Sequence, residues 1–318
     1  MAILTIALAA LSGCADPEPD AQRPAPADPI PVRDAQPPAG PQYDPYGLLP
    51  GGEILAPPPE DPLPTPRVET LLMPSLARTP QPRAETPYRA PVPVRLRPIE
   101  EPAEDQVLRG MLVEPEGIDP AGAVLLVPEW WGLNEAMIEE ARILGSWGFL
   151  TLAFDLYDGA VAETRAEASA LARSLDRQEA LRAMSAAAGW LAGEATTDTL
   201  AVAVVGWNWG ATLALALAGE EPRLGAAALI NPSPIVDQAR LEPISAPLLV
   251  FFTTSGGWIT PAEATGFARA LEQAGVDHAV IRYTMTPQAL LDPQTAAERS
   301  YRDTARRRLR EFLDDRLD

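Results

Sequence analysis

The stretch VVGWNWGATLALALA, residues 204–218, decides the fold. An apolar run leads into a Gly-Trp-Asn-Trp-Gly turn, and a second apolar run of helical length follows it. Gly206 and Gly210 lack the Cβ atoms that would keep a strand and a helix apart, and asparagine is among the residues that best tolerate a positive φ. The stretch therefore predicts a buried strand, a strained turn centred on Asn208 and a buried helix.

This turn has the spacing of a nucleophile elbow, in which the residue between two glycines presents its side chain at the end of a strand. In enzymes that use such a turn, the central side chain attacks a carbonyl carbon. Asn208 stands at that position, and an amide is not a nucleophile. The turn thus predicts the geometry of an elbow without its covalent chemistry.

Further apolar runs flank this stretch, and amphipathic segments separate most of them. The expected strands lie near residues 107–113, 123–128, 149–154, 200–206, 226–230, 247–252 and 279–284. Asn134 is placed to cap the first helix, Pro261 to begin another, and residues 293–316 to form a charged closing helix. Continuous apolar strands indicate a parallel sheet covered on both faces, which predicts a three-layer α/β domain with a mostly parallel sheet.

The composition divides the chain into a proline-rich part and a folded part. Of the 36 prolines, 24 lie in residues 15–98, where no hydrophobic period persists, so we expect a disordered tether there. Residues 99–318 are long enough for one substantial core. Their 33 acidic residues against 17 arginines carry most of the formal net charge of −19. This acidity argues against binding to nucleic acid.

Residue types on which many enzymes depend are scarce in this chain. All 25 basic residues are arginines, so a Schiff-base or phosphate-loop lysine is excluded. Cys14 is the only cysteine and His278 the only histidine, so we expect no zinc or other metal site and no cofactor. His278 precedes an expected strand, and we predict that it lies on the surface, at the end of the sheet opposite the elbow.

Residues 1–14 form an apolar segment that is too short to span a bilayer. The segment ends in LSGC, residues 11–14, which resembles the lipobox of bacterial lipoproteins. The resemblance implies cleavage before Cys14, lipidation of that cysteine and a domain held in the cell envelope, in the periplasm or outside the cell. Ala15 favours the outer membrane in this scheme. The alternative is an N-terminal core helix with a buried cysteine.

Around the elbow the sequence resembles the dienelactone hydrolase family of α/β-hydrolases, over nearly all of residues 107–316. Two segments carry the resemblance, VPEWWGLN at residues 127–134 and AFDLY at residues 153–157, in which Ala-Phe replaces the family's proline. The family hydrolyses esters or lactones with a Cys–His–Asp triad that a strand-end glutamate assists. The resemblance implies that Glu129 is that glutamate and that Asn208 replaces the cysteine.

The other two triad positions are substituted as well. Counting along the flanking segments places the family's acid at Gly257 and its histidine at Gln288. Losing the nucleophile, the base and the orienting acid together removes the chemistry of the triad. The oxyanion hole would persist, because the resemblance builds it from the backbone N–H groups of Trp209 and Trp130.

Aromatic residues gather in the loops that should meet at the carboxyl ends of the strands. Besides the two tryptophans of the oxyanion hole, they are Trp131, Tyr157, Trp207 and Trp258. The rings either fill the volume of a lost active site or line a ligand pocket, to which Glu129 would add negative charge. We therefore expect a non-catalytic module that binds a small molecule or serves as a scaffold for a protein partner. The alternative is an active hydrolase that cleaves an ester or lactone through an unrecognised nucleophile.

Overall fold

The computed structural model describes residues 68–71, 90–103, 106–194, 201–255 and 259–317. The chain divides into two compact units, Met1–Gln42 and Tyr43–Asp318, and every described residue belongs to the second unit. Cys14 and the expected signal segment lie outside the described residues, as does most of the expected tether. Within the described ranges, no helix is long and apolar enough to cross a membrane.

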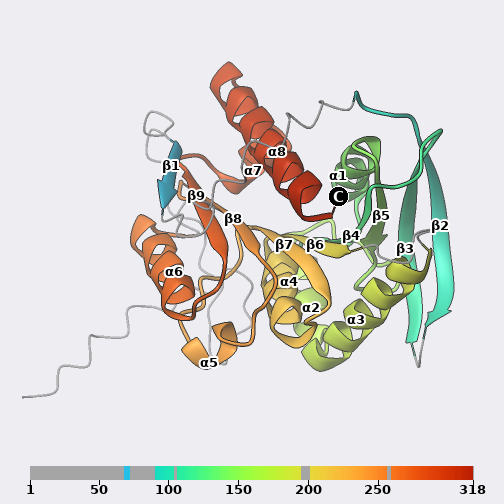
Figure 1. Cartoon of the computed structure of the whole chain (residues 1–318), viewed down its shortest axis with the longest axis horizontal. Coiled ribbons are helices and arrows are strands. Elements are labelled where there is room, and N and C mark those ends of the chain that lie inside the picture. Colours follow the sequence, from blue (N-terminus) through green and yellow to red (C-terminus); the bar gives the residue numbers. More distant parts are fainter. Residues whose placement is uncertain (1–67, 72–89, 104–105, 195–200, 256–258, 318) are drawn as a thin grey trace, which may run out of the picture. The chain divides into compact units, whose positions relative to one another are not determined.

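The described strands of the second unit form one nine-stranded sheet (Figure 1). Their order is β1-β9-β8-β7-β6-β4-β5-β3-β2, in which β4 to β9 run parallel to one another and β1, β2 and β3 pair antiparallel. The strands are β1 (Val68–Leu71), β2 (Val94–Ala103), β3 (Gln106–Pro115), β4 (Gly122–Val127), β5 (Phe149–Phe154), β6 (Val202–Trp207), β7 (Leu224–Ile230), β8 (Leu248–Thr253) and β9 (His278–Tyr283). The predicted α/β domain with a mostly parallel sheet is confirmed.

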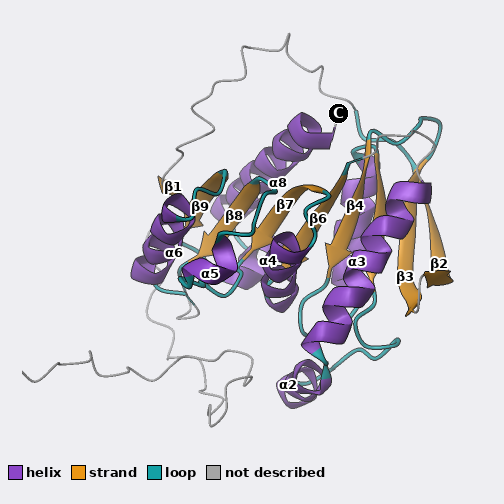
Figure 2. Cartoon of the chain, turned by 60° about the horizontal axis from the view of Figure 1, so that its bottom comes forward, coloured by secondary structure: helices purple, strands orange, loops and turns teal. Residues whose placement is uncertain are grey.

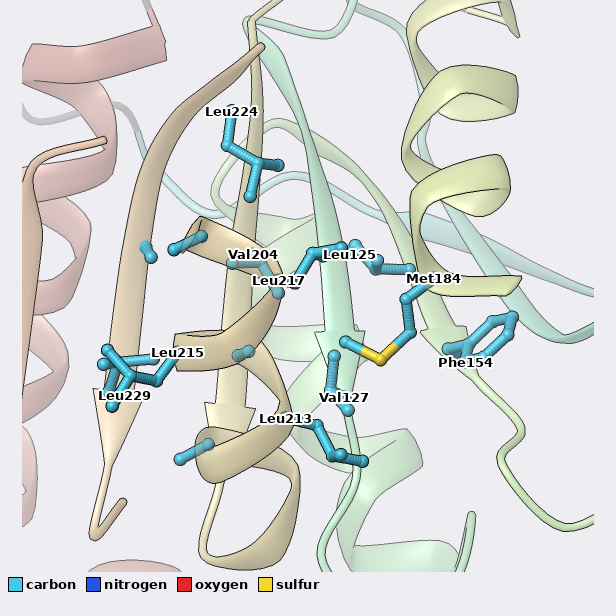
Figure 3. Packing of buried hydrophobic residues seen from close by; sticks show 14 of the residues in the cluster. Leu125, Val127, Phe154, Met184, Val204, Leu213, Leu215, Leu217, Leu224 and Leu229 are labelled. Carbon is cyan, nitrogen blue, oxygen red and sulfur yellow. The ribbon is translucent and has the colours of Figure 1, made fainter. Parts of the chain in front are cut away.

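Helices cover both faces of this sheet (Figure 2). They are α1 (Glu135–Ser146), α2 (Arg165–Ser174), α3 (Arg177–Glu194), α4 (Trp209–Glu220), α5 (Gln238–Leu241), α6 (Pro261–Gln273), α7 (Pro287–Leu291) and α8 (Ala296–Leu317). Two hydrophobic clusters result, one with α3, α4 and α6 and the other with α1 and α8. Because side chains alternate along a strand, Val204 lies in the first cluster and Val205 in the second. Figure 3 shows Leu213 and Leu217 of α4 packed in the first cluster.

The domain begins earlier than the composition predicts. Strand β2 starts at Val94, five residues before the expected boundary at residue 99, and β1 pairs with β9 although it lies inside the expected tether. Pro98 and Pro102 argue against a strand in the sequence, because proline has no backbone N–H to donate. β2 is an edge strand, where a missing N–H is tolerated. The run of β1 is only four residues long, too short to show a period.

Two predicted helix starts are confirmed, and the expected closing helix forms but begins at Ala296 instead of residue 293. Asn134 caps α1 by accepting a hydrogen bond from the backbone N–H of Met137 at 3.1 Å. Pro261 is the first residue of α6 and follows a capping box at Thr260. The charged closing segment forms α8, which packs on the sheet and forms an ion pair with α1 between Arg306 and the buried Glu140.

Candidate functional site

The elbow connects β6 to α4. Asn208 has φ 49° and ψ −110°, a conformation that L-residues rarely adopt, so the predicted strained turn is confirmed. Its backbone N–H donates to the carbonyl of Ile230 at 2.7 Å, which ties the turn to the end of β7. The side chain of Asn208 is thereby presented at the carboxyl edge of the sheet, where open α/β sheets place their ligands.

The two elbow glycines are required by close backbone approach. A Cβ atom on Gly206 would lie 2.6 Å from the Cα of Ala211, and one on Gly210 would lie 2.2 Å from the carbonyl oxygen of Pro128. Without a Cβ on Gly206, the start of α4 can pack directly against the end of β6. Without a Cβ on Gly210, α4 can contact the backbone at the end of β4. Because Glu129 follows Pro128 directly, this packing brings the glutamate to the elbow.

Glu129 and Asn208 meet at the centre of the site. The Nδ2 atom of Asn208 donates to Oε2 of Glu129 at 2.8 Å, and Glu129 is only 5% exposed. Burial raises the pKa of the Glu129 carboxyl above its usual range, and the hydrogen bond from Asn208 opposes that rise. The elbow side chain therefore acts as a neutral donor that holds a buried acid in place.

His278 is at the wrong edge of the sheet to serve this site. It is the first residue of β9, so it lies at the amino ends of the parallel strands, as predicted. The predicted surface position is wrong, because His278 is 1% exposed and its Nδ1 atom lies 2.8 Å from the carbonyl oxygen of Val276. His278 pairs with Leu248 of β8, and the sequence did not show this contact. The elbow thus has no imidazole base.

The positions of the family's acid and histidine are described only in part. Gln288 lies on α7, and its side chain is exposed. Gly257 and Trp258 lie outside the described residues. In the described part of the chain, no group of three or more His, Cys, Asp or Glu side chains could hold a metal ion.

Four of the aromatic residues share the hydrophobic cluster on the α4 face. Trp130, Trp209 and Tyr157 are buried, whereas Trp131 is half-buried and packs edge-to-face on Trp130 with ring centroids 5.6 Å apart. Burial raises the pKa of the Tyr157 hydroxyl, and its interaction with the Trp209 side chain opposes that rise. Trp207 does not join this group, because it ends β6 in the cluster on the opposite face.

Sequence reasoning missed two polar links beside the elbow. Thr212 on α4 accepts a hydrogen bond from the backbone N–H of Ser233 at 2.9 Å, which fixes the loop after β7. Asn231 has φ 55°, and its Oδ1 atom accepts from the backbone N–H of Thr253 at 2.7 Å. An asparagine directly after an apolar strand is the signal that Asn231 and Asn208 share, and it could have indicated the second strained turn.

Comparison with known families agrees with this architecture. The model of the dienelactone hydrolase family matches residues 108–314. The chain belongs to the dienelactone hydrolase family. No curated protein matches the chain in sequence.

Several solved structures share the fold. Dienelactone hydrolase from Anabaena variabilis is 22% identical with a TM-score of 0.54, and the match covers 71% of this chain and 99% of that one. A promiscuous phosphotriesterase similar to dienelactone hydrolases, from metagenomic libraries, is 20% identical with a TM-score of 0.58 and the same coverage. An esterase from Rhizomucor miehei is 17% identical with a TM-score of 0.55, over 70% of this chain and 84% of that one.

Proposed function

We propose that this domain is a non-catalytic member of the dienelactone hydrolase family that binds a ligand at the carboxyl edge of its sheet. The observation that carries the proposal is the hydrogen bond from the Asn208 amide to Glu129, at the position where an elbow presents its nucleophile. An amide in that place holds a carboxylate and contacts a ligand, but it cannot form an acyl-enzyme.

The scarcity of histidine and lysine in the chain supports the same proposal. Activating a hydroxyl or a thiol at neutral pH takes an adjacent base, which is most often a histidine or a lysine. The chain has no lysine, and its one histidine lies at the opposite edge of the sheet. Neither of these two residue types stands at the elbow, which supports a non-catalytic role.

The second candidate is a hydrolase that uses another nucleophile, and family membership favours it. Ser255 is the best such residue, because it is buried just after β8 and its hydroxyl makes no hydrogen bond among the described residues. Its backbone N–H donates to the carbonyl of Met285, a contact that positions the loop without activating the hydroxyl. A fluorophosphonate probe separates the two candidates, since only an activated serine reacts with it.

The aromatic group beside Glu129 indicates the ligand class. Trp131 is half-buried, whereas the other members of the α4-face group are buried, and a tryptophan face attracts apolar molecules and cations. The buried Glu129 carboxylate adds a negative charge close to the same loop, because it precedes Trp130 and Trp131 in the chain. We propose an apolar or cationic small molecule as the ligand, with a scaffold role for a protein partner as the alternative.

Ligand binding should be visible in tryptophan fluorescence. We expect benzyltrimethylammonium to quench or shift the indole emission, and Glu129→Gln to weaken its binding about tenfold, because a charge pair near a protein surface contributes roughly 1–4 kcal/mol. Neopentylbenzene, the neutral molecule of the same shape, is the control and should bind both proteins equally. A flat titration with both compounds would favour a scaffold whose rings are fully packed.

We also propose that the chain is anchored in the cell envelope through Cys14, on the strength of the lipobox-like LSGC and the proline-rich stretch that follows it. Mass spectrometry of protein extracted from its native membrane should find a mature chain that begins at lipidated Cys14, and Cys14→Ser should abolish the lipid mass. An intact Met1 in protein from the soluble cytosolic fraction would contradict the anchor.

A further inference from the structure

The backbone of Asn208 has a geometry that most asparagines in folded proteins lack. Viewed along the Cα–C bond of Asn208, its Cβ is rotated by about −120° from its own backbone nitrogen, as tetrahedral geometry requires. A ψ of −110° therefore places the nitrogen of Trp209 almost directly behind that Cβ, so the two are nearly eclipsed. A succinimide is a five-membered ring that contains this nitrogen, the Cα, the Cβ and the Cγ, and it can close only when nitrogen and Cβ are eclipsed. The elbow therefore holds Asn208 in the backbone conformation of that ring.

We propose that the Asn208–Trp209 bond is a self-modification site, at which the folded elbow cyclises Asn208 to a succinimide and water then opens the ring to aspartate or isoaspartate. This inference goes beyond ligand binding and does not depend on it. The elbow turn that presents a nucleophile in an enzyme here presents an electrophile, the Cγ of its own asparagine, to the next backbone nitrogen.

The chemistry balances with water as the only co-reactant. The nitrogen of Trp209 forms a bond to Cγ of Asn208 and gives up its proton, while the bond from Cγ to Nδ2 breaks and Nδ2 leaves with that proton as ammonia. Water then adds to one of the two imide carbonyls and breaks its bond to nitrogen. Opening at Cγ gives aspartate, and opening at the backbone carbonyl gives isoaspartate.

Contacts with Thr212 and Glu129 favour the cyclisation. The carbonyl oxygen of Asn208 accepts from the backbone N–H of Thr212 at 3.2 Å and from its hydroxyl at 3.4 Å, which draws electron density from the peptide and makes the Trp209 N–H more acidic. The Glu129 carboxyl lies 2.8 Å from the departing nitrogen and can exchange a proton with it.

The other asparagines of the chain are natural controls. The sequence contains only Asn134, Asn208 and Asn231. Asn134 has ψ 176°, which points the next nitrogen away from its Cβ. Asn231 precedes Pro232, whose nitrogen carries no proton to give up. The proposal therefore selects Asn208 alone.

Conversion to aspartate would change the charge of the site. A second carboxyl would replace the amide that now lies 2.8 Å from Glu129, and two carboxylates at that distance cannot both ionise at neutral pH. The pair would share one proton, as interacting acids do. The site would then lose its neutral donor and gain an acid pair in a buried setting.

Peptide mapping of the full chain tests the proposal. Purified protein is held at mildly alkaline pH, both folded and unfolded in urea, and the peptides with the three asparagines are followed by mass spectrometry over time. We expect Asn208 to lose ammonia and then gain water at least about tenfold faster in the folded chain, because the turn pre-orients the reacting atoms. An Asn208→Gln variant should lose the signal, since its ring would need one more atom.

Two outcomes would overturn the proposal. One is an Asn208 that stays intact in the folded chain while the same residue reacts in urea, which would mean that the elbow protects it. The other is a folded chain in which Asn134 reacts as fast as Asn208, which would show that the backbone conformation has no effect. Both readouts use the unmodified sequence and do not require any variant to fold.

Discussion

Replacing Gly210 with alanine should strongly destabilise the domain. The new Cβ atom would lie 2.2 Å from the carbonyl oxygen of Pro128 and 2.4 Å from that of Val127, and both atoms belong to the backbone of β4 and the loop after it. No side-chain rotation relieves such a contact, so α4 must move away from the sheet. We expect a loss of at least about 3 kcal/mol, a large part of the stability of a domain of this size.

The measurement is the free energy of unfolding from urea titrations followed by circular dichroism. Gly266→Ala in α6 and Gly189→Ala in α3 are matched controls, because nothing lies within 4 Å of a Cβ atom at either position. Both controls should leave stability unchanged or raise it by about 0.5–1 kcal/mol, the helix preference for alanine. A Gly210→Ala protein as stable as these controls would show that the elbow is not packed against β4 in this way.

The second large effect is on catalysis. Asn208→Cys alone should not hydrolyse an activated ester above the buffer rate, because no base faces the new thiol and the Glu129 carboxylate disfavours its ionisation. Combining it with Gly257→Asp and Gln288→His restores all three residue types of the family's triad. We expect that triple variant to be at least about 100-fold faster than Asn208→Cys, since nucleophile and base act as a unit.

All of these proteins should carry Cys14→Ser, so that the elbow thiol is the only one. The matched control keeps Gly257→Asp and Gln288→His with Asn208→Ala, which reports ester hydrolysis by the new histidine alone. Turnover by Asn208→Cys without the other two changes would mean that a base reaches the elbow after all, and the account of the site would be wrong.

The fold could be predicted because its signals are local and strong. The strands β4, β6 and β8 are continuous apolar runs, and the two glycines around Asn208 mark the close contact between strand and helix. The edges could not be predicted in the same way. Pro98 lies within β2, and β1 is held by pairing with a strand more than 200 residues away, which no local pattern shows.

The site could be predicted only as a set of positions. Family resemblance placed Glu129 and Asn208 at the same edge of the sheet, but their hydrogen bond depends on how closely Gly210 approaches Pro128. Trp207 faces the α1 and α8 side of the sheet because side chains alternate along β6. The sequence alone did not show that β6 continues through Trp207, so this direction could not be predicted.

The most direct test of the central claim is the rate at which the wild-type protein hydrolyses p-nitrophenyl acetate, measured beside Asn208→Ala. An elbow that carries an amide and faces a buried carboxylate predicts no turnover above buffer for either protein, and no labelling of either by a fluorophosphonate. Wild-type turnover well above the buffer rate that Asn208→Ala abolishes would contradict the account and show that this elbow is catalytic.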